Sequence, residues 1–185
     1  ACAIALGLTS VAIGDGDAVG ISVATRAGEQ IIPPRRRRDI LHDAAELFQA
    51  IDVRKGGDAS VAGALTRVVA EPRLVVITDF LGESERALAE LRVASAAGSE
   101  VFAIHVAAEQ ELDPPSRTFT ATDPEKPEFR RAMTSVNRRE YLSAFASWRE
   151  RIAGELHAMH AHYVLTSTAE PVRDAVRRIV DSATR

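Results

Sequence analysis

A strand, a helix and a second strand follow one another in the middle of the chain, and this succession limits the folds open to it. The apolar run in "RLVVITDF" (73–80) leads into the helical pattern of "SERALAELRVASAAG" (84–98), and then into "EVFAIHVA" (100–107). Strands joined through a helix pair in parallel. Helices that alternate with apolar strands predict an α/β fold, here a three-layer Rossmann-like sandwich around a mostly parallel sheet.

The rest of the sequence continues the alternation. We expect helices at 1–13, 36–51, 60–70, about 136–160 and 171–183, and strands at 17–25, 28–34 and 162–168. The strands 17–25 and 28–34 form a hairpin in this interpretation, and Pro33 and Pro34 end it. Segment 108–129 holds four prolines and predicts an irregular excursion or a small hairpin. The long helix carries an apolar stripe that we expect in the core: Leu142, Phe145, Trp148, Ile152, Leu156 and Met159.

Length and composition indicate one ordinary soluble domain over residues 1–185. A chain of 185 residues buries roughly 70% of its unfolded surface. The net charge of −3 gives no general attraction to nucleic acid or to an anionic membrane. Cys2 is the single cysteine, which excludes an internal disulfide and fits a reducing, cytoplasmic compartment. The chain opens at Ala1 inside an apolar pattern, and we expect it to be a portion of something longer.

Asp79 stands where the buried strand 73–80 ends. In parallel sheets, ligands bind beyond the carboxyl ends of the strands, so this carboxylate lies at the edge where such folds keep their sites. It could hold a metal, activate water, flank a phosphate bound by neighbouring amides, or cap the next helix.

Five segments occur in an order typical of a known family. They are "GDAVGI" (16–21), "PPRRRRDIL" (33–41), "LVVITDFL" (74–81), "GSEVFAIHV" (98–106) and "HYVLTSTAEPV" (162–172). Together they resemble domain-of-unknown-function family fifty-eight, a branch of the von Willebrand factor A-like domains found beside MoxR-type AAA+ ATPases. The resemblance implies a strand order like 3-2-1-4-5-6, in which segments 17–25 and 73–80 flank a central first strand. That strand is missing from the sequence and would precede Ala1.

The resemblance also implies a metal-ion-dependent adhesion site, whose hard oxygen ligands suit magnesium. Asp79 falls on its third-loop aspartate. The second-loop threonine is replaced within "GGDASV" (56–61), where Asp58, Ala59 or Ser60 takes its place, and no Asp-x-Ser-x-Ser occurs. The site is incomplete, so we expect magnesium only in a complete protein and none bound by this chain.

Each of these residues also has a structural interpretation. Asp79 can serve as a helix cap, and Asp58 and Ser60 are good N-cap residues for the helix that follows them. The arginine run 35–38 could contact phosphates, but acidic residues follow it directly.

The sequence holds no nucleophile elbow, phosphate loop or dinucleotide fingerprint. We therefore expect a non-enzymatic protein-interaction module that acts with a MoxR-type ATPase in assembling or activating client proteins. The alternatives are a metal-dependent hydrolase on a Rossmann-like sheet and a nucleic-acid binder that uses the arginine run.

Overall fold

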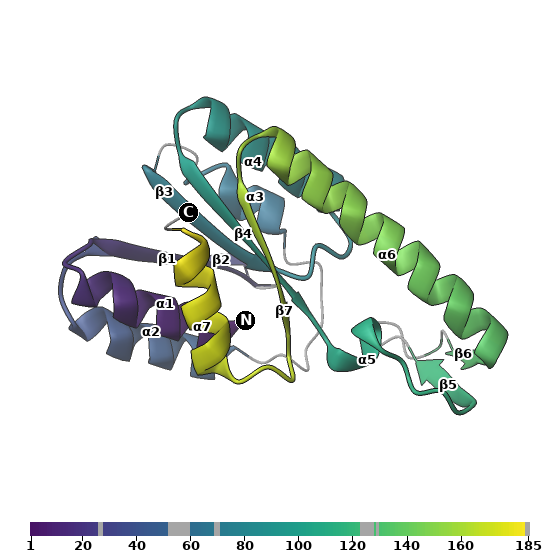
Figure 1. Ribbon diagram of the computed structural model, residues 1–185. Coiled ribbons are helices and arrows are strands. Elements are labelled where there is room, and N and C mark those ends of the chain that lie inside the picture. The colour runs from purple at the N-terminus through teal and green to yellow at the C-terminus, as the bar shows by residue number, and fades with distance from the viewer. Residues whose placement is uncertain (26–27, 52–59, 69–70, 123–127, 129, 184–185) are drawn as a thin grey trace.

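The structure is a computed structural model, and it describes residues 1–25, 28–51, 60–68, 71–122, 128 and 130–183. Seven helices and seven strands are found in these residues (Figure 1). The helices are α1 (Cys2–Gly14), α2 (Asp39–Ala50), α3 (Val61–Leu65), α4 (Ser84–Ala96), α5 (Glu109–Leu112), α6 (Ser135–Ala158) and α7 (Val172–Ser182). The strands are β1 (Val19–Thr25), β2 (Gly28–Arg35), β3 (Arg73–Thr78), β4 (Glu100–Ala107), β5 (Phe119–Thr122), β6 (Arg130–Met133) and β7 (His162–Ser167).

Three strands form the central sheet, in the order β3-β4-β7, and all of them are parallel. The predicted crossover is confirmed: β3 pairs with β4 from Arg73↔Glu100 onward, and α4 connects them. Gly98 has φ +96°, a conformation that L side chains rarely adopt, so a glycine is suited to the turn after α4. The chain is an α/β protein with a parallel sheet, as the alternating pattern predicts.

Two apolar clusters form the core and use opposite faces of this sheet. The first joins Leu74 and Val76 of β3 and Val101 of β4 to buried residues of α4 and α6. The second joins Phe102 and Ile104 of β4 to residues of α1 and α7. Neighbouring residues of β4 point to opposite faces of a strand, which is why a continuously apolar strand supplies both clusters.

The hairpin β1–β2 is confirmed, but its prolines do not end it. β2 continues through Pro33 and Pro34 to Arg35, which pairs with Val19 across an irregularity in the register. Proline lacks an N–H and is tolerated at a bulge or on an edge strand. Gly20 lies opposite and makes room, because a Cβ there would stand 2.9 Å from Pro34 Cγ.

In the described part of the chain, β1 pairs only with β2, and β3 pairs only with β4. An ion pair of 3.9 Å joins Arg73 Nη1, at the start of β3, to Asp17 Oδ2, just before β1. Direct pairing of β1 with β3 would contradict an intervening strand, and it is not observed. The intervening strand stays a prediction.

The prediction that the whole apolar stripe of α6 lies in the core is wrong for its N-terminal part. Ile152 and Leu156 are fully buried and belong to the first cluster, and Trp148 packs against that cluster while partly exposed. Leu142 and Phe145 are only half-buried. A helix of 24 residues is about 36 Å long, whereas the longest strand of the central sheet, β4 with 8 residues, extends about 26 Å. The helix therefore overshoots the sheet (Figure 1).

Two predicted helices begin or end elsewhere. Helix α2 begins at Asp39, so residues 36–38 precede it, and α3 ends at Leu65 before a short series of turns. None of the helices described has the length and apolar character that crossing a bilayer requires.

Candidate functional site

The end of β3 forms a tight, self-bonded turn. The Asp79 carboxylate accepts a hydrogen bond from the Leu81 N–H at 2.9 Å, and the Thr78 hydroxyl accepts one from the Phe80 N–H at 3.2 Å. Short polar side chains favour such turns because they substitute for backbone partners. Asp79 is exposed at the predicted edge of the sheet, where it stabilises the turn.

Phe80 has an unusual backbone for a bulky residue. Its φ is +56°, a strained region that such residues avoid at a cost of about 1–3 kcal/mol. Its side chain is buried, with its ring 5.4 Å from the His105 ring in an edge-on arrangement. Burial of Phe80 stabilises the turn, and the next side chain, Leu81, is left 55% exposed.

His105 lies on β4 beneath this turn and is 1% exposed. Its Nδ1 is hydrogen-bonded to the Tyr163 hydroxyl at 2.9 Å, and its ring meets the Trp148 ring edge-on at 5.4 Å. Burial, and after it the positive charge of Arg149, lowers the pKa of His105 to about 4, against the opposing effect of Asp79. The imidazole is therefore neutral at pH 7. Sequence reasoning missed this cluster, although a histidine inside an apolar strand was its signal.

Ser60 is the N-cap of α3, as its structural interpretation predicts. Its hydroxyl accepts a hydrogen bond from the Gly63 N–H at 2.9 Å and donates one to Glu83 at 2.7 Å. Glu83 precedes α4, so Ser60 ties α3 to α4 near the end of β3. Asp58 lies outside the described residues.

The described oxygens do not by themselves make a magnesium site. No hydrogen bond joins Ser60 to Asp79 in the described chain, and no three Asp, Glu, His or Cys residues gather there as metal ligands. Magnesium needs several oxygens in near-octahedral geometry, and both functions of the Ser60 hydroxyl are already in use. A metal role for Asp79, Ser60 and Asp58 stays a prediction.

The arginine run is partly neutralised by the acidic residues that follow it. Arg35 forms ion pairs with Asp39 and Asp43, and Arg37 Nε lies 3.3 Å from Asp39. These contacts favour a structural interpretation of the run, as the segment that leads from β2 into α2, over phosphate binding.

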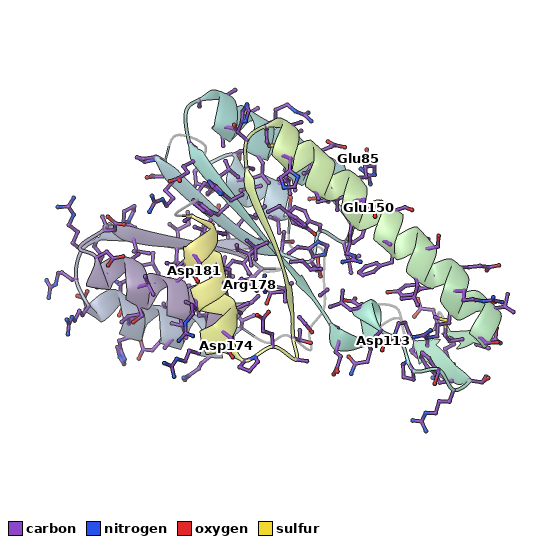
Figure 2. The ribbon with its side chains drawn as sticks, in the orientation of Figure 1. Glu85, Asp113, Glu150, Asp174, Arg178 and Asp181 are labelled. Atoms are coloured by element: carbon purple, nitrogen blue, oxygen red, sulfur yellow. The ribbon has the colours of Figure 1, made fainter. Side chains whose placement is uncertain are left out.

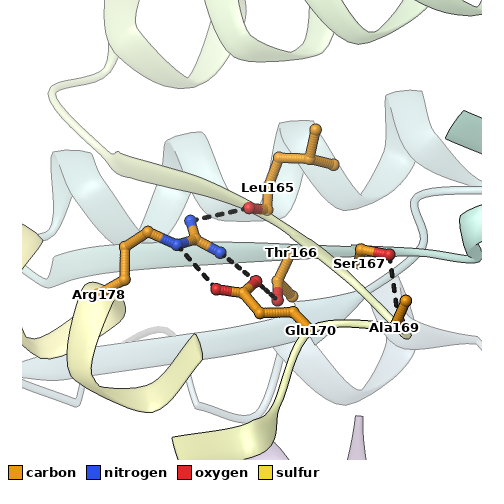
Figure 3. A network of polar contacts seen from close by, with 6 residues as sticks. All are labelled: Leu165, Thr166, Ser167, Ala169, Glu170 and Arg178. Atoms are coloured by element: carbon orange, nitrogen blue, oxygen red, sulfur yellow. Dashed lines mark hydrogen bonds and ion pairs between the residues drawn. The ribbon is translucent and has the colours of Figure 1, made fainter. Parts of the chain in front are cut away.

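A second polar network fixes the carboxyl end of β7 (Figure 3). Glu170 accepts a hydrogen bond from the buried Thr166 at 2.8 Å and pairs with Arg178 of α7 at 2.6 Å. Arg178 also donates to the Leu165 carbonyl at 2.9 Å. The Arg178 hydrogen bonds hold the pKa of Glu170 below its usual value, against its burial. Segment 162–172, singled out in the sequence, holds Thr166 and Glu170, but their connection to Arg178 was not predicted; this network joins α7 to β7.

A comparison with known families confirms the family that the sequence resembles, over residues 1–151. A family model described as Protein of unknown function DUF58 matches residues 1–151. Searches of curated proteins and of solved structures returned no match. Because the family model covers well over half of the 185 residues, the chain belongs to the family of proteins of unknown function DUF58.

Proposed function

We propose that this chain is a non-enzymatic protein-interaction module that acts in the cytoplasm with a MoxR-type AAA+ ATPase. We further propose that it is a von Willebrand A-like domain. The resemblance in the sequence suggests the partner, and the geometry of the β3 end supports the proposal that this face meets it.

The observation that carries this proposal is the exposure of Leu81 on a strained turn. Leu81 is a large apolar side chain that is 55% exposed. If a partner covers it, the removal of its apolar surface from water stabilises the complex. The turn that presents Leu81 is held by the Asp79 carboxylate and by the buried Phe80 ring. Strained residues kept in place by their surroundings are found preferentially at functional sites.

Asp79→Ala tests the face. The substitution removes one hydrogen bond at an exposed turn, which costs about 1 kcal/mol of stability, so the domain should stay folded. It frees the turn and removes a charge from the face, and we expect binding to a purified MoxR-type ATPase from the same organism to weaken about tenfold, or roughly 1.4 kcal/mol. Biolayer interferometry measures the affinity.

Asp181→Ala is the matched control. Asp181 is an exposed carboxylate near the C-terminal end of α7 (Figure 2), and its removal changes the net charge equally without touching β3. Equal affinities for the Asp79 and Asp181 variants would remove this face from the mechanism. A loss of melting temperature well beyond the about 2–4 °C that 1 kcal/mol represents in a domain of this size would instead assign Asp79 a mainly structural role.

The metal-dependent hydrolase remains the second candidate, supported by the position of Asp79 at the carboxyl edge of the sheet. Calorimetry with magnesium separates the two functions. We expect no saturable heat below millimolar magnesium, because the described ligands are too few. Tight one-to-one binding that disappears in Asp79→Ala would favour the hydrolase.

A further inference from the structure

Arg149 is a half-buried cation on α6 that lacks a counterion in the part of the chain the structure describes. Its Cζ lies 5.2 Å from the centre of the Phe145 ring, and its Nε is buried without a hydrogen-bond partner. No ion pair joins it to a described carboxylate, whereas Arg92, Arg138 and Arg178 each have one. Glu150, the next residue along the chain, lies on the side of α6 away from the sheet (Figure 2).

This arrangement leaves the Nε–H donor of the guanidinium without a hydrogen-bond partner. A guanidinium carries five N–H donors in its plane, and stacking on a ring satisfies the charge in part but none of those donors. Partial burial of a charge without hydrogen-bonding partners is unfavourable. An anion with acceptors in the guanidinium plane would remove this penalty.

The surroundings of Arg149 are aromatic and weakly polar. Burial raises the pKa values of Tyr141 and Tyr163 and lowers that of His105, and the nearby positive charge of Arg149 acts to lower all three. Burial makes His105 neutral, so it adds no competing positive charge. An arginine stacked on an aromatic side chain matches the composition of binding hot spots in protein interfaces.

We propose that Arg149 binds a carboxylate side chain of the partner protein. A carboxylate matches the planar guanidinium through two parallel hydrogen bonds. The negative charges of Asp79 and Glu111 influence the pKa values of His105 and Tyr141, respectively. Negative charge in this region disfavours a dianionic phosphate more than a singly charged carboxylate. The inference rests on the proposed function, because it adds a polar contact with the same partner to the apolar contact proposed at Leu81.

The single tryptophan gives a direct measurement. Trp148 precedes Arg149, and its ring lies 5.4 Å from the Phe145 ring, so occupation of Arg149 should change its fluorescence. The protein is titrated with sodium acetate, with sodium chloride holding the ionic strength constant. We expect a saturable change with a midpoint on the order of 10–100 mM, as for one charge-assisted contact.

Variants identify the residue responsible. Arg149→Gln should weaken acetate binding at least tenfold, and Arg149→Lys, which keeps the charge but loses the planar fork, should weaken it less. Arg139→Gln is the matched control, because Arg139 is an exposed arginine on the same helix. It should bind acetate as the parent does.

Three results of the titration would overturn the inference: no saturable change with acetate, equal acetate binding by Arg149→Gln, or tighter binding of inorganic phosphate at the same ionic strength. Because the titration contains no ATPase, it tests the carboxylate site separately from the proposed partner. Acetate binding without ATPase capture would refute the proposed partner and keep the carboxylate site. Capture by Arg149→Gln at the parent affinity would remove Arg149 from the interface.

Discussion

The two halves of α6 share one apolar stripe but have different surroundings. Leu156 and Ile152, in the C-terminal half, are fully buried between the sheet and α4. In the N-terminal half, Tyr141 and Phe145 stack on each other with ring centres 5.6 Å apart and stay half-exposed. The same periodicity therefore builds a core where the sheet lies beneath it and an accessible aromatic surface where the sheet has ended.

The N-terminal half is nevertheless held in place. Thr134 caps the helix by accepting a hydrogen bond from the Asn137 N–H at 3.3 Å, and Arg138 donates to the Pro114 carbonyl at 2.7 Å and pairs with Asp113. These contacts tie the protruding end to the segment after β4. The aromatic surface is thus presented on a fixed support, which is what a binding face requires.

The largest effect is expected in the C-terminal half. Leu156→Ala removes a side chain that is 0% exposed, and we expect a loss of about 2–5 kcal/mol in the free energy of unfolding because a cavity remains. Leu142→Ala makes the same chemical change in the half-buried N-terminal half and should cost about 1 kcal/mol. Urea denaturation followed by circular dichroism measures both. Similar losses for the two variants would show that the halves do not differ.

The pH dependence of stability tests whether His105, which lies against α6 where its two halves meet, is sealed from water. His105 contacts Trp148, and its pKa is about 4 in the folded chain against 6.5 in a free side chain. The unfolded chain binds the proton more readily, so this contribution to stability is complete above pH 6.5 and falls as the pH approaches 4. Between pH 7 and pH 5 the loss should be about 2 kcal/mol.

His105→Gln should flatten that part of the pH dependence, measured by urea denaturation at both values. His42→Gln is the control, because His42 is exposed on α2 and its replacement should keep the parent's slope. If the slope of His105→Gln also matches the parent, water reaches His105 and the boundary is not sealed.

The smallest effect is expected between the stacked rings. A double-mutant cycle with Tyr141→Ala and Phe145→Ala should give a coupling of about 0.5–1.5 kcal/mol. The exposed Val136 is 52% accessible, and Val136→Ala, paired with Tyr141→Ala in a second cycle, should give no coupling beyond error. Zero coupling between the rings would mean that each one stabilises the helix independently.

The sequence predicted the order of elements well because that order depends on local periodicity. The crossover from β3 to β4, the hairpin and the long helix all follow from patterns within a few residues of one another. The prediction that Phe145 is a core residue was wrong for a different reason. The apolar periodicity of a helix carries no information about the length of the sheet that it packs against. Likewise, Pro33 and Pro34 end a strand in general, but Gly20 across the hairpin makes room for them here.

The candidate site was predicted less completely. The position of Asp79 at the carboxyl edge follows from its place after an apolar strand, and the capping role of Ser60 follows from its residue type. The contact of His105 with Phe80 and Tyr163 joins three segments far apart in the chain. The spacing of these residues in the sequence does not predict this contact. The contact depends on the register of the strands and on the unusual φ of Phe80.

The order of the parallel strands also has a kinetic consequence. Strands β3 and β4 are joined by one short crossover through α4, whereas β7 reaches β4 only after the excursion and the whole of α6. Closing the longer connection costs roughly 1 kcal/mol more in chain entropy. The β3–β4 pair is also completed earlier during synthesis at the ribosome. The growing polypeptide can therefore form that pair first, and addition of β7 and α7 becomes the slow, late step that sets how long the apolar face of β4 stays exposed to other chains.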